Sequence, residues 1–199
     1  MNSSKLLLSA AFILATFSNA ALPQAEAKNL ATVAASAKSA TKATPNNSNY
    51  ELNFPAKRAM AQILWNKTAD QTVLAEGSKK AKVRVLALGQ VRLPKDVLFE
   101  VVLLPEALDH MESIQQFAPL PIVNIVASKL DFTDEHMKHL KNLKGLLHLN
   151  LDETLITDKS LALIGTFKEL TTLRLSVTDV TGSNFEALSK LPHLITLNI

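Results

Sequence analysis

Residues 146–158 read LLHLNLDETLITD, with leucine at positions 146, 149 and 151. The same L-x-x-L-x-L spacing of apolar residues begins again at positions 122, 170 and 194, which gives a constant 24-residue period. The aligned positions form three columns: Ile122, Leu146, Leu170 and Leu194; Ile125, Leu149, Leu173 and Leu197; and Ala127, Leu151, Leu175 and Ile199. Self-similarity over so many positions at one period predicts a repeat protein.

The second half of each 24-residue unit is predicted to be helical. Its apolar residues recur three positions apart, which places them on one face of a helix. They form the columns Met137, Leu161 and Phe185; Leu140, Ile164 and Leu188; and Leu143, Phe167 and Leu191. Thr133 with Asp134, and Thr157 with Asp158, supply side-chain oxygens where these helices should begin. One unit cannot bury its own apolar side, so the units are predicted to stack around one core with parallel strands on one face.

The units within residues 122–199 resemble those of the leucine-rich-repeat family, in particular the exported bacterial kind with 24-residue units. The resemblance implies an α/β solenoid, with short parallel strands on one face and helices on the other. The family commonly places Asn, Cys or Thr in the turn column that holds Thr154 and Thr178 here, and this side chain bonds the neighbouring backbone. The first unit has Leu130 in that column, so we expect a looser turn there.

The N-terminal residues indicate export. Residues 1–20 have the features of a secretory signal peptide, in which Lys5 precedes an apolar run and Ser18, Asn19 and Ala20 suit signal peptidase. The run is roughly half the ~20 residues that a transmembrane helix needs, so we expect no membrane span after cleavage; an uncleaved anchor is the alternative. Residues 21–50 hold almost no large apolar residue and are predicted to be a disordered linker. The expected location is the periplasm, the cell envelope or, for a secreted protein, the medium.

Residues 51–121 are predicted to form an N-terminal cap, with a helix and a β-hairpin, followed by a degenerate first unit. A short helix is predicted over residues 55–66, because apolar residues follow a proline there at helical spacing. Alternating apolar residues over 83–88 and 97–104, with turn residues between them, predict a half-buried strand pair. Residues 97–121 then resemble an incomplete unit, whose helical half holds Met111, Ile114 and Phe117.

The alternation of side chains along the strands defines a candidate binding surface. In this repeat class, residues between the apolar columns point away from the core and form a polar sheet surface, which we call the strand face. The predicted ligand-binding residues are Asn124, His148, Asn150, Asp152, Thr172, Arg174, Ser176, Thr196 and Asn198. Neighbouring rungs can exchange hydrogen bonds, and Arg174 is placed to pair with Asp152. We expect this face to bind another protein, since such scaffolds carry function on exposed faces; a merely solvated surface is the alternative.

The charges are distributed unevenly along the chain. Residues 51–95 hold 9 basic and 3 acidic side chains, whereas residues 96–199 hold 8 basic and 14 acidic ones. This asymmetry indicates either a site for an anionic polymer or electrostatic complementarity between two parts of the molecule. The alternative binding site is a basic patch of Lys79, Lys80, Lys82, Arg84, Arg92 and Lys95. Neither aromatic platforms nor a known nucleic-acid module accompany these residues, so we do not expect a nucleic acid as the partner.

No catalytic residue, cofactor or metal site is predicted. The chain has no cysteine, which excludes disulfides and thiolate metal sites. It also lacks a G-x-S-x-G motif and a phosphate-binding glycine loop. His136 and His139 lie three positions apart beside acidic residues, and this spacing could place both imidazoles on one helix turn to bind a metal ion. We interpret them as solvated helix residues, so an enzyme is not expected.

Two functions follow from these features. The first is an exported protein-interaction module that holds another protein on the strand face. The second is a structural cell-envelope component that binds an anionic polymer through residues 79–95 and associates with itself through the last repeat. No polar cap follows Ile199, and a strand edge with exposed apolar residues invites pairing with another chain. A fragment of a longer chain would have the same end.

Overall fold

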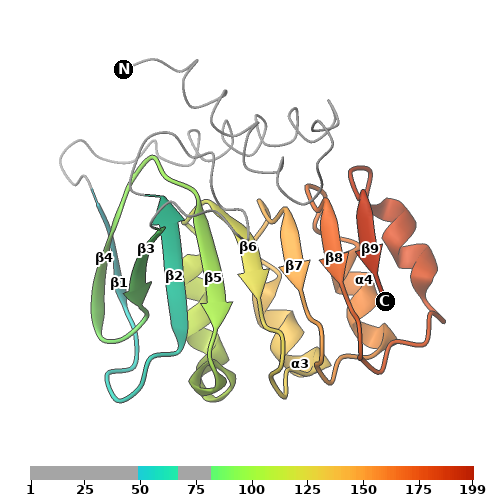
Figure 1. Ribbon diagram of the computed structural model, residues 1–199, viewed down its shortest axis with the longest axis horizontal. Helices are drawn as coiled ribbons and strands as arrows, with labels where there is room; N and C mark the ends of the chain where they lie inside the picture. Colours follow the sequence, from blue (N-terminus) through green and yellow to red (C-terminus); the bar gives the residue numbers. More distant parts are fainter. Residues whose placement is uncertain (1–48, 67–81) are drawn as a thin grey trace.

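The computed structural model describes residues 49–66 and 82–199, and this part of the chain contains two β-sheets. The larger sheet has seven strands in the order β3-β2-β5-β6-β7-β8-β9, and the smaller sheet pairs β1 with β4 (Figure 1). The strand bounds are β1 (Asn49–Asn53), β2 (Ala61–Asn66), β3 (Lys82–Leu86), β4 (Gln90–Pro94), β5 (Phe99–Leu103), β6 (Ile122–Val126), β7 (His148–Asn150), β8 (Thr172–Arg174) and β9 (Thr196–Asn198).

Strands β5 to β9 run parallel and lie side by side in chain order (Figure 1). Their register aligns equivalent positions of the repeat: Asn124 pairs with His148, His148 with Thr172, and Thr172 with Thr196. Between β5 and β6 the register shifts at Phe99. From β6 to β9, the 24-residue period of the sequence is therefore the offset between paired residues of neighbouring strands.

Short helical segments connect the parallel strands and lie on one face of the sheet (Figure 1). They are η1 (Pro105–Phe117), a 3₁₀-helical segment kinked at His110, α3 (Asp134–Met137), η2 (Lys138–Leu140), η3 (Asp158–Ser160), α4 (Leu161–Ile164) and η4 (Phe185–Lys190). Their apolar residues, such as Met137, Leu161 and Leu188, are buried. In the structure, the predicted helical half of each unit consists of short helical segments in place of one regular helix. The chain must leave one strand and return to the next within a single repeat unit, which leaves few residues for a helix.

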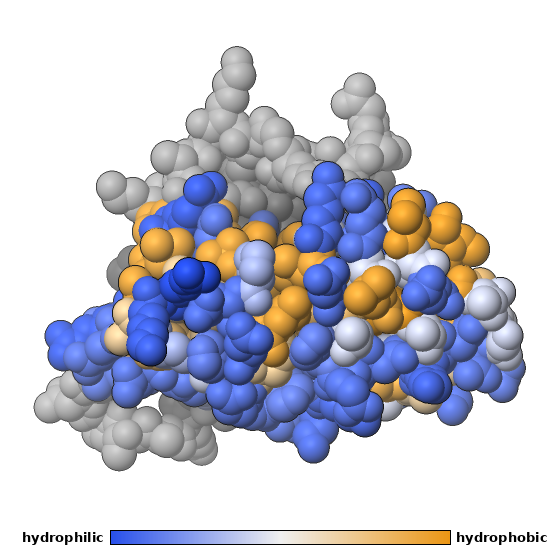
Figure 2. Space-filling model, turned by 90° about the horizontal axis from the view of Figure 1, so that it is seen from below, coloured by the Kyte–Doolittle hydropathy of each residue, from blue (hydrophilic) through white to orange (hydrophobic). Residues whose placement is uncertain are grey.

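The apolar columns of the repeat form the core. Ile125, Leu149 and Leu173 are at most 1 % exposed, whereas Leu197, in the edge strand β9, is 39 % exposed. An interior side chain is covered by equivalent side chains of both neighbouring strands, and its burial contributes roughly 1.5–3 kcal/mol. Among the described strands, β9 is an edge of the larger sheet. Ile195 and Ile199 are also exposed there, and Figure 2 shows hydrophobic residues on the surface toward that end of the sheet.

The N-terminal part differs from the expected helix and hairpin. Residues 61–66 form strand β2, so the helix predicted over residues 55–66 is wrong. β2 lies between β3 and β5 and pairs antiparallel with both, so the two strands predicted at 83–88 and 97–104 do not form a hairpin. Ile63, Leu64 and Trp65 are all buried. A strand covered on both faces carries apolar residues in succession, and over a short run this pattern resembles helical spacing.

The small sheet was not expected from the sequence. Residues 90–94 form β4, which includes part of the predicted turn, and β1 begins at Asn49, within the predicted linker. Leu52 and Leu93 of this sheet belong to the same core as the repeats. Asn53 exchanges two hydrogen bonds, of 2.7 and 2.6 Å, with the side chain of Gln116 in η1. The predicted signal peptide and the rest of the linker, residues 1–48, lie outside the described residues.

The turns after β6, β7 and β8 share one backbone conformation. Lys129, Glu153 and Val177, which occupy the same position in successive units, have positive φ angles of 62°, 56° and 57°. The turn with Leu130 therefore has nearly the same positive φ angle as the other two. The threonines in this column donate their hydroxyls to backbone carbonyls, both at 2.7 Å: Thr154 to Leu151 and Thr178 to Leu175.

We expect Val177→Asn to raise the free energy of unfolding by about 1 kcal/mol, because a β-branched residue at positive φ is strained by roughly 1–2 kcal/mol and Asn tolerates this conformation. Val177 is 79 % exposed, so the substitution loses little packing. Urea denaturation measures the change. Val126→Asn, in the extended strand β6, is the matched control and should bring no gain, because φ is negative there. Equal effects of the two substitutions would show that Val177 is not strained.

Candidate binding site on the strand face

The register sets the predicted ligand-binding residues side by side in rows across the sheet. One row consists of Asn124, His148, Thr172 and Thr196, and the next consists of Asn150, Arg174 and Asn198. Asp152 and Ser176 follow shortly after β7 and β8, in the turns. The sequence prediction of which residues are neighbours on this surface therefore agrees with the pairing of the strands.

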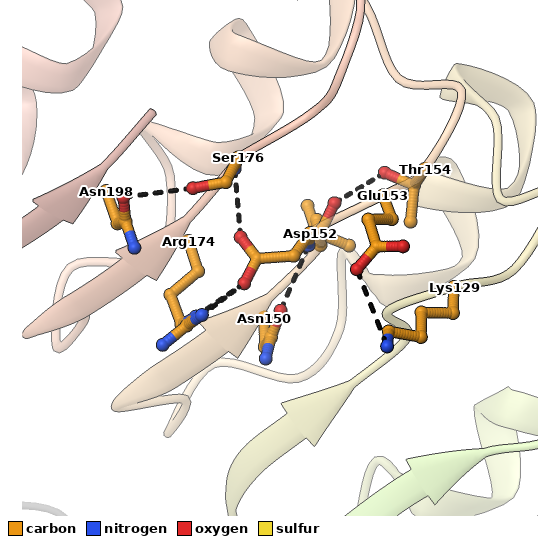
Figure 3. A network of polar contacts seen from close by, with 9 residues as sticks. Lys129, Asn150, Asp152, Glu153, Thr154, Arg174, Ser176 and Asn198 are labelled. Atoms are coloured by element: carbon orange, nitrogen blue, oxygen red, sulfur yellow. Dashed lines mark hydrogen bonds and ion pairs between the residues drawn. The ribbon is translucent and has the colours of Figure 1, made fainter.

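Asp152 is the centre of a polar network on this face (Figure 3). Its Oδ2 atom accepts a hydrogen bond from Nε of Arg174, at 2.6 Å, and forms an ion pair with Nη2 of the same guanidinium, at 2.5 Å. Its Oδ1 atom accepts a hydrogen bond from the backbone N–H of Ser176, at 2.9 Å. The side chain of Asp152 is 11 % exposed, whereas that of Arg174 is 42 % exposed. The predicted pairing of Arg174 with Asp152 is present, but the aspartate is shielded, so it orients the arginine and offers little surface to a ligand.

Two asparagine side chains extend the network. Oδ1 of Asn150 accepts a hydrogen bond from the backbone N–H of Asp152, at 3.0 Å, and Oδ1 of Asn198 accepts one from the hydroxyl of Ser176, at 2.9 Å. These bonds fix the orientation of both amides, and each NH₂ group points away from its bonded partner (Figure 3). The sequence predicted the positions of these residues, but amide orientation depends on hydrogen bonds that form only in the folded chain.

His148 is less accessible than the sequence predicted. The residue is only partly exposed, and its Nδ1 atom has almost no contact with solvent. Burial lowers the pKa of His148 from its ordinary value of 6.5 to about 4, because the protonated ring would lose its hydration. The ring is therefore neutral at physiological pH and adds no positive charge to the strand face.

We expect the free energy of unfolding to fall by about 2 kcal/mol between pH 7 and pH 5 because of His148. The unfolded chain binds a proton at His148 below pH 6.5, whereas the folded chain binds it only near pH 4, so acid favours the unfolded state across this window. His148→Thr, which places the residue of positions 172 and 196 on β7, should remove this part of the pH dependence. The pKa of His136 is also lowered, by burial and then by the nearby His139, but His136 is present in both proteins. Parallel pH profiles of unfolding for the two proteins would contradict the shift.

A second set of polar contacts joins the helical halves of neighbouring units. The carboxylate of Asp134 accepts hydrogen bonds from the N–H and hydroxyl of Thr157, at 3.0 and 2.8 Å, and from the hydroxyl of Ser160. Asp158 accepts the equivalent bonds from Thr181, at 3.1 and 2.6 Å. Of each Thr-Asp pair expected to cap a helix, the threonine is at the N-cap, where the hydroxyl of Thr157 accepts from the N–H of Lys159, at 3.3 Å. The aspartate of each pair instead bonds the following unit. The recurrence of Thr-Asp at the repeat period was the signal in the sequence that could have indicated this role.

These contacts change the acidity of Asp134. Burial alone would raise the pKa of its carboxyl, but the hydrogen bonds from Ser160 and Thr157 outweigh it and hold the pKa below the ordinary value. The charged form is therefore the one that the folded protein stabilises. The contribution of Asp134 to the free energy of unfolding is present above pH 3.8 and is lost as the pH falls further. The effect of His148 arises at higher pH, between pH 7 and pH 5, so the two can be measured separately.

The predicted basic patch is divided between the two sheets. Arg84 is exposed on β3, in the larger sheet, and Lys82 begins the same strand. Arg92, on β4, pairs with Glu51 at 3.2 Å, and the ammonium of Lys95 lies 5.8 Å from the centre of the Tyr50 ring. Two of these cations thus have partners within the protein. The remaining members, Lys79 and Lys80, lie outside the described residues.

The described residues contain neither a cluster of metal ligands nor a helix that could span a membrane. Within them, no group of three or more His, Cys, Asp or Glu side chains is arranged to hold a metal ion. Nδ1 of His136 accepts a hydrogen bond from the backbone N–H of Thr133, at 3.0 Å, so this nitrogen is engaged by its own helix. No helix in that part of the chain has the length and apolar character needed to cross a bilayer.

Comparisons with known proteins give no relative from which to transfer a role. No family model, no curated protein and no solved structure matches the chain.

Proposed function

We propose that this chain is an exported leucine-rich-repeat protein whose strand face binds another protein. The parallel register supports the solenoid, because equivalent residues of successive units lie opposite each other from β6 to β9. The observation that carries the binding function is the network around Asp152. It holds polar side chains from three neighbouring strands in fixed positions on one surface (Figure 3).

Fixed polar side chains favour recognition because binding a partner then costs less entropy. A mobile, rotamer-rich side chain loses roughly 0.5–1.5 kcal/mol when an interface immobilises it. Asn150, Arg174 and Asn198 are already oriented by bonds within the protein, so this cost is reduced for all three. Thr172 and Thr196 lie in the next row, where their small side chains allow a partner to approach the network closely.

Site-specific photo-crosslinking in the native cell envelope tests the proposal. A benzoylphenylalanine placed at Thr196, exposed on the strand face, is expected to crosslink to a partner protein. The same group at Lys141, which is exposed after the helical segment η2, is the control and should crosslink little. Crosslinks that form equally from both positions, or from Lys141 alone, would contradict binding on the strand face.

The second candidate is a structural cell-envelope component that binds an anionic polymer and associates with itself through β9. Exposed Arg84 on one edge strand, and exposed Leu197 on the other, favour it. Internal charge complementarity is the competing explanation of the basic segment, and the ion pair of Arg58 with Glu106, at 3.8 Å, joins the basic and acidic parts.

Salt dependence separates the two candidate functions. Binding of a polyanion releases counterions and weakens steeply between about 50 and 200 mM salt, whereas a mixed polar protein interface weakens less. Retention of the full chain on polyphosphate beads, with a steep loss as salt rises, would favour the structural role. Weak retention that does not depend on salt would exclude a polyanion site on the basic patch.

A further inference from the structure

One row of the strand face directs hydrogen-bond donors outward. Asn150, Arg174 and Asn198, which we call the donor row, occupy paired positions on β7, β8 and β9. Neighbouring strands lie about 4.8 Å apart, so the three side chains form a line across the sheet. This line runs perpendicular to the strands and follows from the repeat period alone.

The acceptor atoms of the donor row are occupied within the protein. Oδ1 of Asn150 accepts from the backbone N–H of Asp152, and Oδ1 of Asn198 accepts from the hydroxyl of Ser176. Both oxygens of Asp152 accept bonds as well, from Ser176 and Arg174. The groups directed away from the network are the two amide NH₂ groups and the outer N–H groups of the guanidinium (Figure 3).

The surface charge at the donor row comes from the arginine. The side chain of Arg174 is 42 % exposed and that of Asp152 is 11 % exposed, so a ligand on this face meets the guanidinium before the carboxylate. His148, in the adjacent row, is neutral at physiological pH because its pKa is lowered to about 4. Lys129 and Glu153, in neighbouring turns, pair with each other at 3.6 Å and offset each other's charge.

We propose that the donor row binds a carboxylate-bearing segment of the partner protein, an acidic peptide with one carboxylate on Arg174. This inference rests on the proposed binding function. A carboxylate only accepts hydrogen bonds, and the guanidinium can bind it through two parallel N–H groups. The NH₂ groups of Asn150 and Asn198 then meet carbonyl or carboxylate oxygens on either side. A partner lysine or arginine would meet only donors at this row.

The acidic composition of residues 96–199 does not oppose this contact strongly. Charges in solution are screened over about 8 Å at physiological ionic strength, so distant acidic side chains contribute little at Arg174. Hydrogen bonds between two charged groups are roughly twice as strong as those between neutral groups. The nearest acidic group is Asp152, which is bonded to Arg174 and only 11 % exposed, so a partner's carboxylate meets the outer N–H groups of the guanidinium on the side away from it (Figure 3).

An NMR titration of the full chain with synthetic peptides tests the donor row. The first peptide alternates Asp and Ser, the second has Asn in place of each Asp, and the third has Lys there. The side-chain N–H signals of Asn150, Arg174 and Asn198 report binding directly. We expect the Asp peptide to shift all three signals and to bind about tenfold more tightly than either of the others.

One variant pair separates the row from a general charge effect. Asn198→Asp keeps an oxygen that accepts from Ser176 and replaces the outward NH₂ group by a second carboxylate oxygen. It should weaken binding of the Asp peptide by about tenfold. Asn184→Asp makes the same change of charge at an exposed position before η4 and should change affinity by less than about twofold.

The results of the titration and of the crosslinking distinguish a failure of the donor row from a failure of the proposed protein partner. Equal affinity for the Asp and Asn peptides, equal losses in the two variants, or no shift of the three signals at millimolar peptide would overturn the donor row. Crosslinking from Thr196 would then still support a protein partner on this face. Selective binding of the Asp peptide without crosslinks from Thr196 would uphold the donor row and contradict the proposed protein partner.

Discussion

Asp152→Ala is expected to lower the free energy of unfolding by about 3 kcal/mol, because it removes two hydrogen bonds to a charged group and each such bond contributes roughly 1.5–3 kcal/mol. The substitution leaves the guanidinium of Arg174 without its counter-charge and the backbone N–H of Ser176 without its acceptor. The side chain of Arg174 is 42 % exposed and regains water, so we expect the lower end of that range. Urea denaturation near pH 7 measures the loss.

Two further variants isolate the source of this effect. Asp152→Asn keeps an oxygen for the N–H of Ser176 and loses the charge, so it should cost less than Asp152→Ala. In the double variant Asp152→Ala with Arg174→Ala, the second substitution should cost little, because the cation that was left unpaired is also removed. Additive losses from the two alanine substitutions would contradict the coupling between these residues.

Gly165→Ala is expected to destabilise the protein by a similar amount, about 3 kcal/mol, since overpacking costs roughly 1–3 kcal/mol and more where the backbone resists. Gly165 is buried after α4, and a Cβ atom there would lie 2.4 Å from the backbone oxygen of Ala187, in η4. Because the close atom belongs to the backbone, no side-chain rotation relieves the clash. The two helical segments must therefore move apart.

The control for Gly165→Ala lies one unit earlier. Lys141 occupies the position of the preceding unit that is equivalent to Gly165, and it is exposed. Lys141→Ala should change the free energy of unfolding by less than about 0.5 kcal/mol. Thermal unfolding of both variants, followed by circular dichroism, measures the difference. Similar small effects at the two positions would show that α4 and η4 do not approach as closely as the structure indicates.

The N-terminal strands show where local pattern is insufficient. The apolar residues of 61–66 fit both a helix and a strand buried on two faces, and the helix predicted from their spacing was wrong. β2 is a strand because β3 and β5 supply pairing partners on both sides. Those partners lie far along the chain, so nothing within residues 61–66 specifies them. β1 and β4 were missed for the same reason, since each depends on the other.

The candidate site was predictable in position and not in accessibility. The period places Asn150, Arg174 and Asn198 in one row, which agrees with the register. The shielding of Asp152 and His148 depends on the side chains and turns that surround them, and these are brought together only by folding. The outward direction of the two amides depends likewise on bonds to Asp152 and Ser176.

By itself the sequence determined which residues of the repeat face the core and which residues of neighbouring strands pair, because a constant 24-residue spacing brings equivalent side chains to equivalent places. Only the tertiary structure decided the order of β1 to β5, the bonding of Asp134 and Asp158 to the following unit, and the orientation of the donor row. The physical reason is that apolar periodicity is a local property of the chain, whereas strand pairing, the burial of side chains and amide orientation depend on contacts between residues distant in sequence.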